Sequence, residues 1–355
     1  MAPPSTSPTP TGTIAGAAAS DVGASTTISA VHPDILSTHI LTLLDGPTLA
    51  SASCASSTLH ALSSDHRLWS HICQSTWPST TTDPRLLHLI SGFPPTGPRS
   101  FFSSSFPLLL SDPTAAQKPH RPSPPPPPEL ISAVDIHYRG NLIFSKVQET
   151  ETVTGWFRCS PFRVDLLDPK DVVMTPIQHP DGDDTCRELS NDLSLSWILI
   201  DPIGRRAVNL SSYKPVHVQR HWLTGEVQVR YSSILAVDHN KGSSSEFVQC
   251  GIVVTCGGSE GGEMQVREVS LQAEDMDGMH LNGKDSLVVL QTAFEGKRLK
   301  RGRSGEVGRK RYEDFLAKKR ERRERKARTE GRLDMMCVAF GVSIFAAFWI
   351  FVLCT

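Results

Sequence analysis

The sequence has no closely spaced pair of cysteines. Its eight cysteines, at positions 54, 73, 159, 186, 250, 256, 337 and 354, include no Cys-x-x-Cys motif. Structural zinc sites usually take ligands from such pairs, and small secreted domains use a regular cysteine framework for disulfides. The spacing argues against both classes and is typical of free thiols in a reducing compartment.

The motifs that most often mark catalytic and metal sites are also missing. We find no serine at the strand-to-helix turn that positions a nucleophile in many hydrolases. The glycine-rich run 257–262 is instead typical of a turn between two strands. His217 and His221 share one strand face, without a cysteine or carboxylate partner at ligand spacing. The acidic stretches 181–184 and 275–278 lack the ligand pattern of a calcium loop. We therefore expect no catalytic residue, no metal site and no cofactor.

Charge is nearly absent from both ends of the chain. Asp21 is the only charged residue in 1–28, a stretch of small residues and proline without the basic start and apolar core of a signal peptide. Such a composition cannot offset the entropy of ordering, so we predict a disordered arm. Residues 335–354 carry no charge, and a helix of that length spans about 30 Å, the thickness of a bilayer core. This pattern predicts a C-terminal transmembrane helix.

What the sequence does contain is a succession of short helical patterns between residues 33 and 73. Pro33 and Asp34 open the first pattern, whose apolar residues recur along one helix face. Asp45 and Asp65 stand where capping residues of later helices belong. About forty residues bury too little apolar surface to be stable alone. We therefore expect this unit to share its apolar face with a partner.

This unit, predicted to span residues 29–75, resembles an F-box. The opening Pro-Asp-Ile-Leu at 33–36 and the closing Leu-Trp at 68–69 match the family pattern without a gap, and the departures are Val31-His32, Ala55-Ser56 and Leu59. The whole sequence is also similar to a group of plant F-box proteins. The resemblance implies docking onto the Skp-type adaptor of a cullin-based ubiquitin ligase. The residues it assigns to that contact are Pro33, Ile35, Leu36, Ile40, Leu44, Pro47, Leu49, Leu68 and Trp69.

Residues 76–129 form a connector rich in proline and serine. Its aromatic and aliphatic residues at 101, 102, 106 and 108–110 are too apolar for a free linker, and we expect them to pack on the F-box helices or on the next domain. The run 122–128 is typical of a polyproline II spacer, with a ligand for a proline-binding module as the alternative.

Residues 130–295 change to a period of two. The predicted strands are Ile131–His137, Asn141–Val147, Gly155–Cys159, Ser194–Ile200, Val216–Trp222, Val227–Ile234, Phe247–Thr255 and Met264–Leu271, and a helix follows at Asp285–Phe294. Short strands separated by turns favour an antiparallel, sandwich-like domain or a strongly curved antiparallel sheet. We expect this domain to bind a client protein. A likeness to plant phloem-lectin sandwiches around Trp197 and Trp222 leaves a glycan ligand open.

Residues 296–334 reverse the charge of the chain. Positions 297–334 hold 17 Lys and Arg against seven Asp and Glu, a net charge of +10, whereas the whole chain carries −1. Residues 309–328 contain no helix breaker and predict an exposed helix supported by ion pairs. Since basic flanks stay cytosolic, the bulk of the chain should face the cytosol. The residues expected to meet anionic lipid are Lys318, Lys319, Arg320, Arg322, Arg323, Arg325 and Lys326.

The sequence thus predicts an α+β protein: a helical F-box, an antiparallel β-rich domain, a basic helix and a C-terminal transmembrane helix. The predicted function is the substrate-recognition subunit of a Skp–cullin–F-box ubiquitin ligase, tethered to a membrane and without catalytic groups. The alternative is a membrane-anchored lectin-like or lipid-binding protein with a vestigial F-box. For the basic run, nuclear import is the second reading, and a nucleic-acid partner is not expected.

Overall fold

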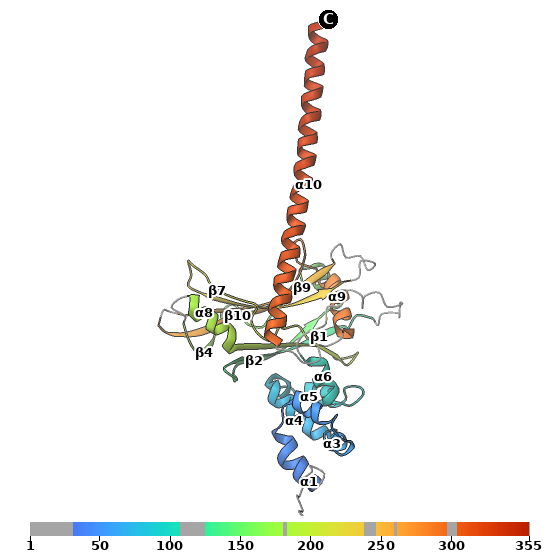
Figure 1. Cartoon of the computed structure of the whole chain (residues 1–355), viewed down its shortest axis with the longest axis vertical. Coiled ribbons are helices and arrows are strands. Elements are labelled where there is room, and N and C mark those ends of the chain that lie inside the picture. The colour runs from blue at the N-terminus through green and yellow to red at the C-terminus, as the bar shows by residue number, and fades with distance from the viewer. Residues whose placement is uncertain are drawn as a thin grey trace, which may run out of the picture.

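The computed structural model describes residues 31–106, 125–179, 183–237, 246–258, 261–296 and 304–354. The predicted N-terminal arm lies outside these residues. Three parts follow one another along the long axis of the molecule: a helical cluster, a β-sandwich and a long C-terminal helix on the side of the sandwich away from the cluster (Figure 1).

The first part is built from short helices that begin at capping residues. An initial helical segment runs through α1 (Pro33–Ile35), the wider π-turn η2 (Leu36–Ile40) and the 3₁₀ turn η3 (Leu41–Leu43). Then come α2 (Gly46–Ala52), α3 (Ser57–Leu62) and α4 (His66–Thr76). Asp45 Oδ1 accepts a hydrogen bond from the Thr48 amide at 2.9 Å, and Asp65 Oδ1 accepts one from the Arg67 amide at 2.9 Å. Both predicted caps are therefore confirmed.

Residues 78–105, assigned to the connector, form further helices: η4 (Pro78–Thr81), α5 (Pro84–Ser91) and α6 (Pro98–Ser105). Each begins with a proline, which is tolerated in a first turn because its missing amide hydrogen needs no partner there. Phe101 and Phe102 are buried, as predicted, among the F-box helices. Positions 108–110 lie outside the described residues. A proline-rich composition thus hides a structured segment whose aromatic residues hold it in place.

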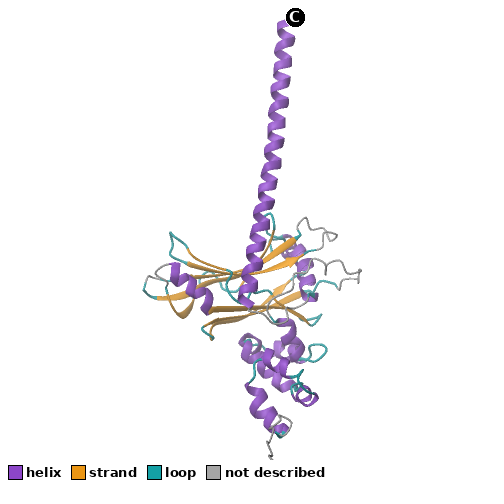
Figure 2. Ribbon diagram, viewed as in Figure 1, coloured by secondary structure: helices purple, strands orange, loops and turns teal. Residues whose placement is uncertain are grey.

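Two antiparallel sheets make up the second part (Figure 2). The first has the order β2-β1-β5-β6, with β1 (Glu129–Tyr138), β2 (Asn141–Glu151), β5 (Leu193–Asp201) and β6 (Arg206–Asn209). The second has the order β3-β10-β9-β8-β7, and β4 also pairs with β10. Its strands are β3 (Arg163–Asp165), β4 (Val173–Gln178), β7 (His217–Arg220), β8 (Val227–Ala236), β9 (Phe247–Gly257) and β10 (Glu263–Asp275). The predicted sandwich-like fold is confirmed.

One predicted strand is wrong and three strands were missed. Residues 155–159 form the helix α7 (Gly155–Cys159), because Thr154 Oγ1 caps it by accepting a hydrogen bond from the Phe157 amide at 3.2 Å. The missed strand β4 contains Pro176, which suppresses the strand pattern and is tolerated where a strand pairs on one side only. The others, β3 and β6, are only three and four residues long. The short helix α8 (Asp183–Asp192) was also not predicted.

The middle strands of the first sheet, β1 and β5, are buried on both faces, which joins the F-box to the sandwich. Every residue of β5 is buried. Its inward side chains, such as Trp197, pack in the sandwich core, whereas Ile198 and Ile200 join one cluster with Trp77 and Phe101 of the helical part. The F-box helices and the β domain therefore share a hydrophobic core.

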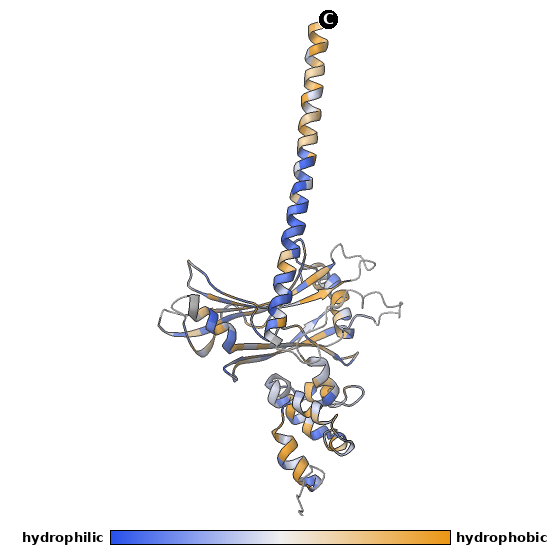
Figure 3. Cartoon of the chain, in the orientation of Figure 1, coloured by the Kyte–Doolittle hydropathy of each residue, from blue (hydrophilic) through white to orange (hydrophobic). Residues whose placement is uncertain are grey.

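Two helices complete the chain. The predicted helix near 285–294 is confirmed as α9 (Gly283–Glu295), capped by Asn282 and packed in the sandwich core. The basic and apolar segments continue into each other as one helix of 51 residues, α10 (Ser304–Cys354). The C-terminal part of α10 is long and apolar enough to cross a membrane. None of its most apolar stretch is buried against the rest of the described structure. Figure 3 shows the change from hydrophilic to hydrophobic along this helix.

Candidate functional site

The first helical segment carries three apolar side chains that the chain itself leaves uncovered. Ile35, Ile40 and Leu43 are 49%, 38% and 82% exposed, and we call them the exposed apolar face. The segment that carries them begins with α1, which lies at the end of the molecule farthest from the C-terminus (Figure 1). The π-turn η2 lies between Ile35 and Leu43, and such turns are frequent at functional sites. Exposed apolar side chains grouped on one segment make it the candidate surface for another protein.

The nine residues assigned to the adaptor contact divide into three groups by their exposure. Leu36, Leu49, Leu68 and Trp69 are buried, and Trp69 Nε1 donates a hydrogen bond to the Ser63 carbonyl at 2.7 Å. Leu44 and Pro47 are half-buried, while Pro33, Ile35 and Ile40 are exposed. The buried group shapes the F-box, and the exposed group can touch a partner.

Leu43 was not assigned to the adaptor contact, although it is the most exposed member of the exposed apolar face. It belongs to the apolar pattern of the first helix but stands at no motif position of the family. Its spacing of three from Ile40 is the signal that places both on one side of a helix.

Polar contacts fix the helical part to the first sheet. The buried Asp135 carboxylate on β1 accepts hydrogen bonds from the Ser79 amide at 2.9 Å, from Ser79 Oγ at 2.6 Å and from Ser145 Oγ at 2.8 Å. Trp77 Nε1 donates to Ser196 Oγ on β5 at 3.2 Å. Burial raises the pKa of the Asp135 carboxyl, and the hydrogen bonds lower it in part. These bonds attach the segment that directly follows the F-box, residues 77–79, to the first sheet.

The seven basic residues expected at a membrane surface are also divided by the structure. Lys319 pairs with Glu274, Arg322 pairs with Asp277, and both partners lie at the end of β10 or just after it. Lys318 Nζ lies 4.4 Å from the centre of the Phe247 ring. The remaining four, Arg320, Arg323, Arg325 and Lys326, are exposed. Part of the basic run thus contacts the β domain and part points to solvent.

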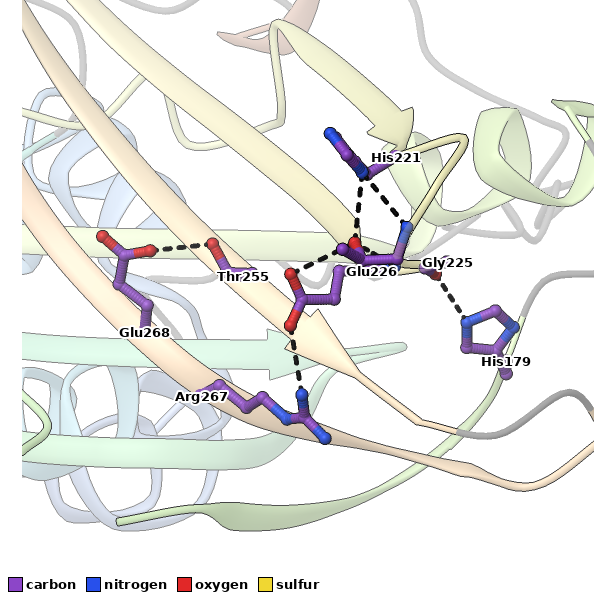
Figure 4. Close-up of polar contacts among 8 residues, drawn as sticks. His179, His221, Gly225, Glu226, Thr255, Arg267 and Glu268 are labelled. Atoms are coloured by element: carbon purple, nitrogen blue, oxygen red, sulfur yellow. Dashed lines mark hydrogen bonds and ion pairs between the residues drawn. The ribbon is translucent and has the colours of Figure 1, made fainter. Parts of the chain in front are cut away.

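Polar contacts fix the shape of the turn between β7 and β8 in the second sheet (Figure 4). His221 Nδ1 accepts a hydrogen bond from the Thr224 amide at 3.2 Å, and the His179 Nε2 position lies 2.9 Å from the Gly225 carbonyl oxygen. The turn leaves Trp222 87% exposed. The predicted strand Val216–Trp222 therefore ends at Arg220, because His221 closes the turn.

The residues singled out for chemistry have other roles in the part of the chain that is described. His221 shapes the turn, whereas His217 lies on β7, and no group of three metal-ligating side chains occurs among the described residues. The glycine-rich run 257–262 lies between β9 and β10, so the elements on both sides of it are strands. Trp197 is buried and donates to Ser132 Oγ at 3.2 Å, so it cannot stack on a sugar.

Comparison with known proteins identifies the family. Residues 33–75 match the F-box-like family. A probable F-box protein of Arabidopsis thaliana is 49% identical over 328 residues, 92% of this chain and 93% of the relative. The chain belongs to the plant F-box proteins. Two further F-box proteins of the same plant are 44% and 45% identical, covering 92% and 91% of this chain and 96% and 89% of their own lengths. No solved structure matches the chain.

Membership in the family gives the exposed apolar face a meaning. F-box proteins are non-catalytic adaptor subunits of ubiquitin ligases, and the F-box implies binding to a Skp-type adaptor. This F-box protein presents its uncovered apolar residues on the segment that opens the family match. The F-box thus supplies a binding surface and no reacting group.

Proposed function

We propose that this F-box protein is the substrate-recognition subunit of a Skp–cullin–F-box ubiquitin ligase, held at a membrane by α10. The observation that carries the proposal is the exposed apolar face, Ile35, Ile40 and Leu43, at the end of the molecule opposite to the apolar half of α10. The F-box binds the adaptor and through it a cullin. The β domain binds the client. The ligase then acts by raising the local concentration of the client near the enzyme that carries ubiquitin.

The adaptor contact is tested by charging the exposed apolar face. Ile40→Asp with Leu43→Asp leaves the buried residues of the F-box in place, because both side chains are exposed. Burying each apolar side chain at an interface is worth about 1.5–3 kcal/mol, so adaptor affinity should fall by about 100-fold or more. Co-purification with a Skp-type adaptor measures the loss.

The matched control is Ile203→Asp, which makes the same exchange at a residue that is 69% exposed in the turn after β5. It should bind the adaptor as the wild type does. Unchanged binding by the double variant would contradict the assignment of the face. Leu36 is unsuitable for this test, because it is 2% exposed and a charge there would unfold the F-box.

The membrane tether is supported by the composition of α10. Its last 20 residues before Thr355 carry no charge, and Figure 3 shows them as the hydrophobic end of the helix. A chain ending at Asp334 should stay in the soluble fraction, whereas the full chain should sediment with membranes and resist carbonate extraction. Equal behaviour of the two chains would contradict the tether.

A second candidate function is favoured by one observation. The rigid turn between β7 and β8 exposes Trp222, and a ligand-binding protein with an unused F-box would have such an aromatic surface. Adaptor co-purification separates the candidates, because only a ligase subunit needs the F-box contact. A Trp222→Ala variant that still binds adaptor but loses a glycan or lipid ligand would favour the second candidate.

A further inference from the structure

The basic half of α10 is attached to the β domain by an apolar contact. Phe315 is 2% exposed and packs in a cluster with Ile234 on β8, Phe247 on β9 and Met276 after β10. Lys318 covers the outer side of this cluster, with its Nζ 4.4 Å from the centre of the Phe247 ring. A buried aromatic ring with a cation above it fixes the helix along the surface of the sheet.

Two ion pairs extend this contact by two helical turns. Arg322 makes a bidentate pair with Asp277, with Nε–Oδ1 and Nη2–Oδ2 distances of 3.0 and 2.9 Å. Lys319, whose side chain is 11% exposed, pairs with Glu274. The Arg322 guanidinium lowers the pKa of the Asp277 carboxyl, and the pairing raises the pKa of Arg322. We call Phe315, Lys319 and Arg322 with their partners the helix lock.

The acidic side of the helix lock is itself held in shape. Asp275 Oδ1 accepts hydrogen bonds from the amides of Asp277 and Met279, both at 2.9 Å, and Gly278 takes a positive φ of 87° in this turn. These backbone bonds hold the turn that presents the Asp277 carboxylate to α10. A preorganised bidentate pair gives direction as well as attraction, unlike a mobile surface pair.

The opposite side of the sandwich is fixed to the F-box. The first sheet shares a core with the F-box helices, and Asp135, Trp77 and Arg205 add polar bonds across that boundary. In Figure 1 the F-box lies beyond the first sheet, and α10 extends from the other side of the molecule. The two attachments lie in series along the long axis.

We propose that α10 is a rigid strut that holds the adaptor-binding end of the F-box at one distance and orientation from the membrane. The inference rests on the proposed membrane tether. Only residues 323–334 separate the helix lock from the apolar segment, and as a continuous helix they add about 18 Å. The basic residues of this short interval, among them Arg323, Arg325 and Lys326, are the ones left to contact anionic lipid.

A strut selects a class of client. Because the F-box cannot swing on a flexible linker, a ligase built on it modifies lysines within one zone of height above the bilayer. The clients that present a lysine in this zone for long enough are proteins of the same membrane with short cytosolic segments. A flexible tether would instead serve soluble clients over a wide range of distances.

The experiment measures the distance between the F-box and the bilayer in the full-length protein. The exposed Cys54 of the F-box carries a donor dye after Ser replaces the other exposed cysteines, Cys159, Cys337 and Cys354, and vesicles of neutral and anionic lipid carry a headgroup acceptor. Single-molecule energy transfer should give one narrow distribution. Asp277→Arg, which places two like charges together at Arg322, should broaden it, and Asp277→Arg with Arg322→Asp should restore it.

Glu321→Arg is the matched control, since Glu321 pairs only along the helix with Arg325 and the exchange adds the same charge as Asp277→Arg. It should leave the distribution narrow. A broad wild-type distribution, or no change in Asp277→Arg, would overturn the strut. Flotation with the vesicles is checked first: a protein that does not float contradicts the tether itself, whereas a floating protein with a broad distribution contradicts only the strut.

Discussion

Asp135 is a single buried carboxylate at the boundary between the F-box helices and the sandwich. Three hydrogen bonds from Ser79 and Ser145 converge on it, yet burial still raises its pKa. A carboxyl whose pKa is higher in the folded than in the unfolded chain stabilises the fold at low pH, and this contribution is lost as the pH rises through the folded-state pKa. Asp135 therefore joins the two parts at some electrostatic cost near neutral pH.

Replacing Asp135 by Asn removes the titration and keeps an acceptor for the Ser79 amide. As the pH falls from 7 towards the ordinary range of a carboxyl, the free energy of unfolding of the wild type should rise relative to that of Asp135→Asn. Urea denaturation followed by tryptophan fluorescence at several pH values measures the difference, because other groups titrate alike in both proteins. A difference that does not change with pH would contradict the raised pKa.

The roles of individual residues were only partly predictable from the sequence. The family pattern identified Trp69 and Leu49 but did not separate the residues that fill the F-box from those that can touch an adaptor. That separation depends on which face of each helix its neighbours cover, which is set by α6 and the first sheet. Likewise, Lys319 and Arg322 differ from the neighbouring cations only through Glu274 and Asp277, which lie 45 residues away in the chain.

Helix α6 connects the helical part to the first sheet through buried aromatic side chains. Phe101 and Phe102 lie in one aromatic cluster with Trp77, with ring centres 5.9 and 5.1 Å from that of Trp77. The same cluster includes side chains of β1 and β5. The helix was not predicted because its serines and prolines mask an apolar face of only a few aromatic residues.

Truncating Phe101 should destabilise the F-box and the sandwich together. Phe101→Ala removes a fully buried ring and should cost about 3–5 kcal/mol. Adaptor binding and sandwich fluorescence should be lost in one shared transition at a lower temperature. Leu87→Ala, a change at a partly exposed residue of α5, should have an effect within about 0.5 kcal/mol. Two separate transitions would show that the parts do not share a core.

At the scale of the element, strand periodicity was more reliable than composition. The long strands β1, β2, β8, β9 and β10 were all predicted from short apolar segments with strand periodicity that are bounded by turn residues, although β1 is buried along most of its length. The failures were short segments or segments with a conflicting residue: β4 contains Pro176, and residues 155–159 form a helix capped by Thr154. In those segments tertiary pairing decides the conformation, and local sequence does not report it.

The whole molecule places its two binding ends far apart. The exposed apolar face lies at one end and the uncharged half of α10 at the other, with the sandwich between them (Figure 1). The order of these parts could be predicted from the sequence, since each has its own periodicity. The coupling between them could not, because it depends on contacts such as Phe315 with Phe247 and Asp135 with Ser79.

For the whole molecule, substitutions in the basic run can distinguish a role at the membrane surface from a role in nuclear import. The structure indicates which residues to change: neutralising Arg320, Arg323, Arg325 and Lys326 to Gln leaves the helix lock intact. The full-length variant should remain membrane-bound, because a spanning helix needs no added charge to stay inserted. It should redistribute among membranes of different anionic lipid content, since each cation near such a surface contributes about 1 kcal/mol. Fluorescence imaging with organelle markers measures the redistribution.

The same four residues decide the alternative when the apolar segment is removed. A chain ending at Asp334 should remain cytosolic with the basic run intact, and it should remain cytosolic after the four substitutions. Nuclear accumulation of the first protein but not of the second would show that the run is an import signal. The membrane role requires the opposite pattern: the charges have no effect on the shortened chain and matter only when the bilayer lies beside them. Imaging both shortened chains together with the full-length pair therefore tests the two roles in one experiment.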